Sequence, residues 1–253
     1  MLGGWIDDGI KPNNILVVDP GADNLGKAAQ LGCRVFSSPL LIEAGYKPDV
    51  IILAVKPQVI ADVLSSYQTY AAEGALVISI AAGARLPVFE ASFGTAVAII
   101  RTMPNTPAAV RRGMIVSCAN NQVSTGQRDV CDQLMRAIGT TAWVDDESLM
   151  DAVTGLSGSG PAYVFYMIQT MKEAGIAAGL PDDLALTLAK ATVAGAGELA
   201  LQTSDSIEQL RKNVTSPNGT TAAGLEVLMG DNALGPLMKR TIAAAAARSR
   251  ELG

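Results

Sequence analysis

The first 145 residues alternate short apolar runs with segments of helical spacing, and this alternation constrains the fold more than any other feature. Six apolar runs predict strands: Ile15–Val18, Val50–Val55, Leu76–Ile80, Val97–Ile100, Met114–Ser117 and Thr141–Val144. The intervening segments Asp23–Leu31, Gln58–Tyr70 and Ser124–Ile138 predict helices. Continuous β-branched or aliphatic runs are typical of strands buried on both faces. We therefore expect a doubly wound, mainly parallel sheet.

The pattern changes at Asp145, after which no strand-like run occurs. Five Ala- and Leu-rich segments predict helices: Pro161–Ala178, Pro181–Gln202, Ser206–Asn213, Gly219–Met229 and Ala233–Leu252. A helical region this apolar, with few charges to solvate it, is expected to pack against a second copy of itself. The sequence thus predicts an α/β domain over residues 1–147 and an all-helical dimerisation domain over 148–253.

Composition excludes several classes of function. The chain has 253 residues, a net charge of −5 and no histidine. The negative charge argues against nucleic acid as a partner. No uninterrupted apolar run reaches the length of about 18 residues that suggests a membrane span, and the start lacks the features of a secretory signal. Without histidine, Ser-His and Cys-His catalysis is excluded, so we expect a cofactor to supply the chemistry.

The three cysteines are Cys33, Cys118 and Cys131. They are odd in number and widely spaced, with no CxxC pair, so they predict buried thiols in a reducing compartment. We expect a cytoplasmic protein without a metal site.

The first residues resemble the helix that follows the glycine-rich turn of a dinucleotide-binding fold. The segment Leu2–Gly9 leads directly to the strand Ile15–Val18, and Asp19 follows where an acidic residue would meet the adenosine ribose. We expect that about 20 residues, one strand and a glycine turn, precede this sequence. The alternative is that Asp19 only closes the following turn.

A second candidate site lies between two predicted helices, at Val214–Thr221. Ser216 is a favourable N-cap and Pro217 a favourable first helical residue. Such a helix start presents the unpaired N–H groups of Gly219 and Thr220, with the Ser216 and Thr221 hydroxyls nearby, and can hold a carboxylate or phosphate. The alternative is a well-capped helix start without a ligand.

Five segments together resemble the Δ1-pyrroline-5-carboxylate reductase family. They are Leu53–Gln58, Ser79–Gly83, Arg101–Pro107, Asp151–Tyr163 and Val214–Thr221, and they occur in the order typical of that family. The resemblance extends from residue 1 to about residue 252.

The resemblance implies a Rossmann-type domain that binds NADPH or NADH, and a helical domain that interlocks into a homodimer and builds larger rings. The implied reaction is reduction of a cyclic imine that carries a carboxylate, Δ1-pyrroline-5-carboxylate, to L-proline, the last step of proline synthesis. The residues implied in cofactor binding are Asp19, Ala54, Val55, Lys56, Pro57, Ala82, Met103 and Asn105. An Asp at residue 19, with Pro20 after it and no adjacent arginine, favours NADH or use of both cofactors.

The resemblance also assigns the substrate site. Val214, Ser216, Gly219, Thr220 and Thr221 are the implied substrate-binding residues, and Thr221 is the implied catalytic residue, with its hydroxyl against the ring nitrogen. For Thr221 the alternative is a first-turn hydroxyl bonded to its own backbone. For Asn105 it is an Asx-type turn, and for Ser157–Pro161 a cap of the next helix.

Two other functions stay open on the sequence. One is a 3-hydroxyacid or 6-phosphogluconate-type dehydrogenase, which needs a lysine on the first helix of its second domain; Lys172 is the only candidate. The other is an inactive, dimeric nucleotide-binding protein, because the glycine turn is not in this sequence.

Overall fold

The computed structural model describes residues 1–81 and 83–253, and it separates into two compact units. The first unit consists of Met1–Gly158 together with Ala246–Gly253, and the second consists of Ser159–Ala245. The domain division expected at residue 147 lies close to this boundary and stays a prediction.

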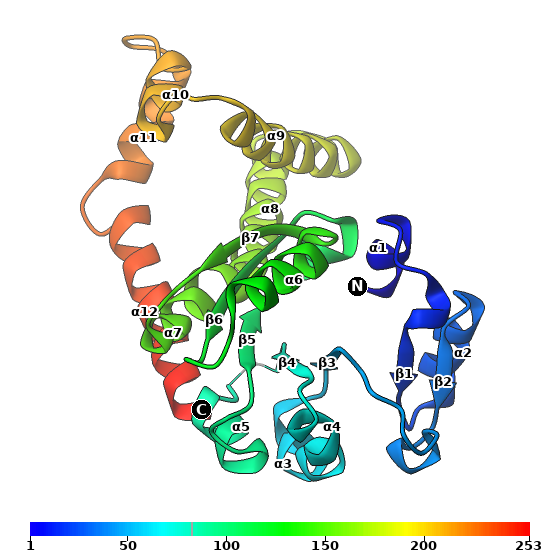
Figure 1. Ribbon diagram of the computed structural model, residues 1–253. Helices are drawn as coiled ribbons and strands as arrows, with labels where there is room; N and C mark the ends of the chain where they lie inside the picture. The colour runs from blue at the N-terminus through cyan, green and yellow to red at the C-terminus, as the bar shows by residue number, and fades with distance from the viewer. Residues whose placement is uncertain (82) are drawn as a thin grey trace. The chain divides into compact units, whose positions relative to one another are not determined.

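The first unit is built on parallel strands joined by helices (Figure 1). Its helices are α1 (Leu2–Asp7), α2 (Ala22–Gln30), α3 (Ile60–Leu64), α4 (Gln68–Ala72), α5 (Leu86–Phe93), α6 (Thr125–Arg136) and α7 (Met150–Val153). Its strands are β1 (Leu16–Val18), β2 (Arg34–Phe36), β3 (Val50–Leu53), β4 (Leu76–Ser79), β5 (Ile99–Met103), β6 (Gly113–Ala119) and β7 (Gly139–Trp143). A π-helical turn, Thr154–Gly158, follows α7.

The strands form two sheets. The larger has the order β3-β4-β5-β6-β7, with only the β5–β6 pair antiparallel, while β1 and β2 pair in parallel in a separate two-stranded sheet. The mainly parallel arrangement is therefore confirmed, but the expectation of a single sheet is wrong for the described residues. Strand β2 was not predicted, because three residues beginning with Arg34 are too short to show a period.

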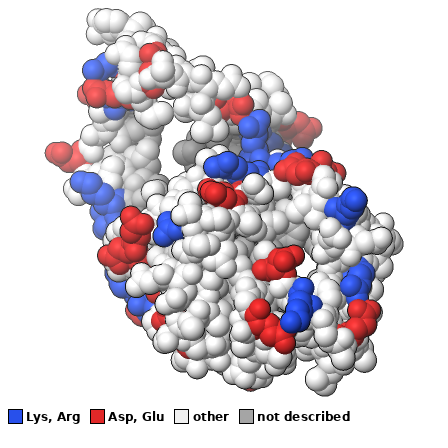
Figure 2. Space-filling view, in the orientation of Figure 1, with Lys and Arg blue, Asp and Glu red and all other residues white. Residues whose placement is uncertain are grey.

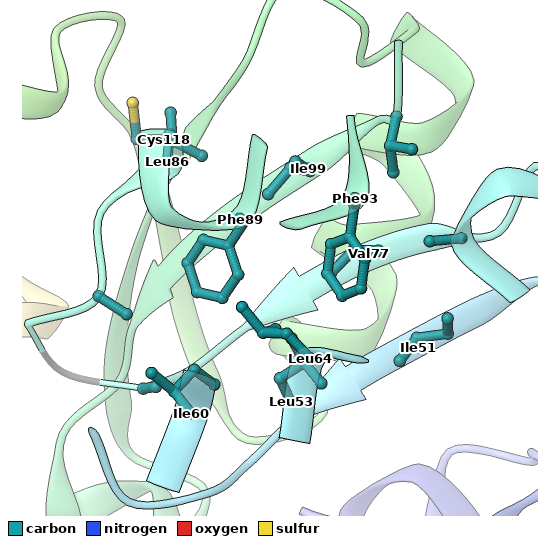
Figure 3. Packing of buried hydrophobic residues seen from close by; sticks show 14 of the residues in the cluster. Ile51, Leu53, Ile60, Leu64, Val77, Leu86, Phe89, Phe93, Ile99 and Cys118 are labelled. Atoms are coloured by element: carbon teal, nitrogen blue, oxygen red, sulfur yellow. The ribbon is translucent and has the colours of Figure 1, made fainter. Parts of the chain in front are cut away.

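Two apolar cores cover the two faces of the larger sheet. Successive residues of a strand point to opposite faces, so Val77 joins the core beneath α3 and α5 whereas Ile78 joins the core beneath α6. Figure 3 shows Phe89 and Phe93 from α5 directed toward Leu64 from α3. Helices on both faces confirm the doubly wound architecture.

The helix predicted over Gln58–Tyr70 is interrupted. A 3₁₀ turn at Ser65–Tyr67 separates α3 from α4, and the Ser65 hydroxyl donates to the Asp62 carbonyl at 3.1 Å. A serine bonded to a nearby backbone carbonyl competes with regular helix hydrogen bonding, which explains the break.

The second unit is all-helical, as predicted. It contains α8 (Gly160–Ala177), α9 (Asp182–Gln202), α10 (Ile207–Asn213), α11 (Thr220–Met229) and most of α12 (Leu234–Leu252), whose last turns belong to the first unit. Helices α8 and α9 pack closely where Gly175 meets Ala185, and a Cβ on Gly175 would lie 3.3 Å from the Ala185 Cβ. The absence of a side chain at Gly175 lets the two backbones approach.

Few side chains of the second unit are buried. In its described residues, only Ala185 and Ala189 of α9 are fully buried, while Phe165 and Tyr166 of α8 are 62% and 66% exposed. A helical unit that leaves large apolar side chains exposed presents a surface for another chain.

Candidate active site

The carboxyl ends of β3, β4 and β5 form one edge of the larger sheet. The parallel register pairs Leu53 with Ser79 and Ser79 with Arg101, so the segments that follow these three strands leave at the same edge. In open α/β sheets, ligands bind outside the carboxyl ends of the strands. This edge brings together Ala54, Val55, Lys56, Pro57, Met103 and Asn105 of the predicted cofactor residues; Ala82 lies outside the described residues.

The residues at this edge differ in what they expose. Ala54 and Lys56 are exposed, whereas the side chains of Val55 and Met103 pack against the core. A small exposed Ala54 leaves the backbone open to a close approach, and Lys56 provides a positive charge beside it. The segment therefore fits a phosphate-bearing cofactor, with Val55 and Met103 able to contribute through their backbone.

Asp19 lies at the end of β1, in the separate two-stranded sheet. Its carboxylate accepts hydrogen bonds from the Gly21 N–H at 2.7 Å and from the Asn24 amide at 3.0 Å. Asp19 thus closes the turn before α2, as the alternative interpretation required. A carboxylate has about four acceptor positions, so these two bonds leave capacity for a ribose hydroxyl.

Asn105 does not behave as a simple turn residue. Its Oδ1 accepts from the Met114 N–H at 2.9 Å, and its Nδ2 lies 3.2 Å from the Ser157 carbonyl oxygen and 3.4 Å from the Ser157 Oγ. It is the N-cap of the 3₁₀ turn Thr106–Val110 but makes no side-chain capping bond. The Asx-turn interpretation is therefore wrong. The Asn105 amide instead bonds to β6 through Met114 and to the π-helical turn through Ser157.

The polar pair of Arg101 and Glu147 is a feature that the sequence analysis missed. Arg101 is buried on β5, and its guanidinium lies 2.9 Å from the Glu147 carboxylate, which also accepts from the Leu86 N–H at 2.8 Å. A charged residue inside an apolar strand was the signal, since a buried arginine requires a partner. The pair holds the α5 start against the segment before α7.

The second candidate site lies at the start of α11, in the helical unit. The helix begins at Thr220 with Gly219 as its N-cap, so the expectation that Ser216 caps the helix and Pro217 begins it is wrong. Asn218 has a φ of 59°, which places it in the left-handed region and prevents the helix from starting earlier. Asparagine tolerates this conformation better than most residues.

The turn before α11 changes which backbone N–H groups are free to bind a ligand. The Gly219 N–H was expected to be unpaired, but it donates to the Ser216 carbonyl at 3.0 Å. Within the described residues, the N–H groups of Thr220, Thr221 and Ala222 have no hydrogen-bond partner. A Cβ on Gly219 would overlap the Ser216 Oγ, so glycine allows that hydroxyl to lie against the helix start.

The Thr221 hydroxyl is also available. In the part of the chain that the structure describes, it makes no hydrogen bond, whereas the Thr215 hydroxyl donates to the Arg211 carbonyl at 2.6 Å. The interpretation of Thr221 as a hydroxyl bonded to its own backbone is therefore wrong. Ser216 and Val214 are exposed in the same segment. The start of α11 combines three free N–H donors, a positive helix end and two hydroxyl groups, which suits a small carboxylate.

Comparison with known proteins follows the same division of the chain. Residues 147–252 match a family model described as pyrroline-5-carboxylate reductase dimerisation, and residues 1–83 match one described as NADP oxidoreductase, coenzyme F420-dependent. The pyrroline-5-carboxylate reductase of Pseudomonas aeruginosa is 39% identical over 253 residues, covering 100% of this chain and 92% of that protein. The chain belongs to the pyrroline-5-carboxylate reductase family. The Synechocystis pyrroline-5-carboxylate reductase is 44% identical over 245 residues, covering 96% and 89%.

Solved structures of pyrroline-5-carboxylate reductases share the fold. The enzyme from Coxiella burnetii superposes with a TM-score of 0.94 at 37% identity, covering 100% of this chain and 93% of that one. The pyrroline carboxylate reductase of Plasmodium falciparum, determined with NADP bound, gives a TM-score of 0.85 at 29% identity and covers 100% and 92%. The predicted family and fold class, a Rossmann-like sheet followed by a helical dimerisation domain, are confirmed.

Proposed function

We propose that this chain reduces Δ1-pyrroline-5-carboxylate to L-proline with NADPH or NADH, as the last step of proline biosynthesis. The main support is the continuous match to pyrroline-5-carboxylate reductases over the entire chain. The start of α11 adds a chemical argument, since its free N–H groups and hydroxyls suit a small cyclic carboxylate.

The cofactor is proposed to lie at the carboxyl ends of β3, β4 and β5. Reduced nicotinamide supplies the hydride when it is bound. Ala54, Val55, Lys56 and Pro57 would contact its ribose and phosphates, and Ala82, Met103 and Asn105 would form the loops around it. NADP binding in the Plasmodium relative and the match to an NADP oxidoreductase model support a nicotinamide cofactor. Asp19 near the adenosine ribose would favour NADH or use of both.

The substrate carboxylate is proposed to bind at the α11 start. The N–H groups of Thr220 and Thr221 would hold its oxygens, with the Ser216 hydroxyl beside them and Gly219 keeping the turn tight. The Thr221 hydroxyl would accept a hydrogen bond from the protonated ring nitrogen and keep it oriented. Because the imine arrives protonated, no side-chain acid is needed, and orientation supplies most of the rate enhancement.

A homodimer is proposed for the assembled protein, with larger rings of dimers. The match of residues 147–252 to a dimerisation model supports self-association.

Figure 2 shows a face on which Lys and Arg lie near Asp and Glu. This mixed surface, together with the net charge of −5, supports a partner other than nucleic acid. Helix α9 is long and apolar enough to cross a membrane, but helices in the core of a soluble protein meet the same criterion of length and composition. We propose that α9 packs in the dimer interface and that the protein is cytoplasmic.

The dehydrogenase alternative is not favoured by the surroundings of Lys172. Its ammonium lies 2.8 Å from the Asp182 carboxylate at the α8–α9 turn, where it joins two helices.

A substrate panel tests the proposed function. In one assay, purified protein is incubated with Δ1-pyrroline-5-carboxylate and NADPH or NADH. In a second assay, it is incubated with the oxidised cofactor and either a 3-hydroxyacid or 6-phosphogluconate. We expect cofactor oxidation with stoichiometric L-proline from the imine alone. Turnover of a hydroxyacid without proline formation would contradict the proposal, and binding of NADPH without any turnover would support the inactive alternative.

A further inference from the structure

Two segments of the first unit are joined through the Asn105 side chain. One is the loop that follows β5, and the other is the π-helical turn Thr154–Gly158. The Asn105 Nδ2 donates to the Ser157 carbonyl at 3.2 Å, and its Oδ1 accepts from the Met114 N–H of β6 at 2.9 Å. One amide therefore connects a loop, a strand and a π-helical turn.

A second, independent contact joins the same loop and turn. A Cβ on Gly158 would lie 2.6 Å from the Met103 Cε, so the end of the methionine side chain lies directly against the glycine. The turn is itself unusual, because π-helical turns are rare and occur frequently at functional sites. The Thr154 hydroxyl at its start donates to the Met150 carbonyl of α7 at 2.8 Å. Side-chain packing of Met103 and the Asn105 hydrogen bond thus both connect the loop to the turn.

The backbone of the loop Met103–Pro107 is restricted by its own sequence, independently of these contacts. Pro104 and Pro107 flank Asn105, and each fixes its own φ angle. Asn105 has an extended backbone, with φ of −127° and ψ of 168°, which directs its side chain away from its own 3₁₀ turn. The orientation of the loop as a body therefore depends on what the Asn105 amide binds.

We propose that Asn105 is a positioning residue, whose amide fixes the loop Met103–Pro107 against the turn Thr154–Gly158. This inference rests on the proposed function, in which that loop lies beside the nicotinamide. It replaces direct contact between the Asn105 amide and the nicotinamide with an indirect role. Loss of the bond moves the loop without removing a cofactor contact, so turnover falls more than cofactor affinity.

The isosteric variant Asn105→Asp tests this role most sharply. It keeps the acceptor for the Met114 N–H but places a carboxylate oxygen against the Ser157 carbonyl, where a donor stood. We expect kcat to fall by about tenfold or more with the cofactor Kd within about threefold of wild type. Hydrogen exchange at the Met114 amide should stay slow in Asn105→Asp and become fast in Asn105→Ala.

Two further variants address the same contact if Asn105→Asp is unstable. Ser157→Ala removes the weaker 3.4 Å partner and keeps the carbonyl acceptor, so kcat should remain near the wild-type value. Asn105→Ala removes the bonds to both Ser157 and Met114 and should lower kcat in the same sense as Asn105→Asp.

The outcomes separate this inference from the proposed function. Wild-type kcat in both Asn105→Asp and Asn105→Ala would overturn the positioning role. In Asn105→Asp, a large rise in the cofactor Kd while the Met114 amide still exchanges slowly would also overturn the positioning role. That result would indicate direct contact between the Asn105 amide and the cofactor. A wild-type protein that binds NADPH but does not reduce the imine would instead contradict the proposed function, and Met114 exchange would still report the connection.

Discussion

Ser249, on the last turn of α12, donates a hydrogen bond of 2.7 Å to the buried carboxylate of Asp151 on α7. The second oxygen of that carboxylate lies 3.4 Å from the Arg85 guanidinium. Since Asp151 is 5% exposed, water replaces neither partner readily. This bond fixes the C-terminal end of α12 within the first unit, although most of the helix belongs to the second.

Ser249→Ala should therefore destabilise the first unit. The substitution leaves a buried carboxylate oxygen without its donor, which costs roughly 1–3 kcal/mol. Thermal or urea unfolding of the purified protein measures the loss. The matched control is Arg248→Ala, on the same helical turn, whose exposed pair with Glu251 should contribute no more than about 0.5 kcal/mol. Equal effects of the two variants would contradict the role of Ser249.

The cysteines should be unreactive in the native protein. Cys33, Cys118 and Cys131 are buried free thiols, and burial raises the pKa of Cys131 from 9.0 to about 12. We expect slow labelling by a thiol reagent at pH 8 and rapid labelling of all three after denaturation. Fast reaction of the native protein would show that these thiols are accessible.

The same shift predicts how stability depends on pH. The folded protein holds the Cys131 proton more tightly than the unfolded chain, whose thiol titrates near 9.0. The contribution to stability is therefore complete below pH 9 and is lost as the pH rises through about 12. In Cys131→Ala this component of the alkaline decline should be missing from urea unfolding curves recorded between those pH values; an identical slope would contradict it.

Self-association should depend on the exposed apolar face of the helical unit. Leu188 on α9 is 46% exposed, and a glutamate there would place a charge in the proposed dimer interface. Sedimentation should find a dimer or larger species for the wild type and a shift toward monomer for Leu188→Glu. Leu40→Glu is the control, because Leu40 is 91% exposed in the first unit and should not alter assembly. A monomeric wild type would refute the interlocked arrangement.

Cofactor choice should respond to Asp19. A carboxylate near a 2′-phosphate costs about 1 kcal/mol at 4 Å in water, or roughly a fivefold preference. NADH should accordingly be used at least as well as NADPH by the wild type, and Asp19→Asn should raise the ratio of NADPH to NADH efficiency by about that factor. Steady-state kinetics with both cofactors measures this. A strong NADPH preference in the wild type would show that Asp19 does not face the ribose.

Periodicity predicted most of the architecture because the fold depends on buried apolar faces. Among the described residues, six of the seven strands and all the helices after residue 159 could be located this way. Strand β2 and the break at Ser65 could not, since the first is too short to show a period and the second depends on one hydroxyl. The antiparallel β5–β6 pair and the separation of β1 and β2 arise from pairing between distant residues, which local patterns do not record.

The candidate site was predicted in part, for a similar reason. Residue types indicated an anion-binding helix start at Val214–Thr221, but the left-handed Asn218 moved that start to Thr220 and used the Gly219 N–H. The bonds of Asn105 to Ser157 and Met114 join residues 52 and 9 positions apart. Such contacts follow from the fold and leave no mark in a short motif.

The kinetics of Thr221→Ala test the central claim most directly. We measure kcat for Δ1-pyrroline-5-carboxylate reduction and the Kd for NADPH in the wild type, in Thr221→Ala and in Thr125→Ala, an exposed first-turn threonine of α6. The account predicts proline formation by the wild type, a loss of about tenfold or more in kcat for Thr221→Ala with little change in Kd, and wild-type behaviour of Thr125→Ala. A Thr221→Ala variant that reduces the imine at the wild-type rate would contradict it.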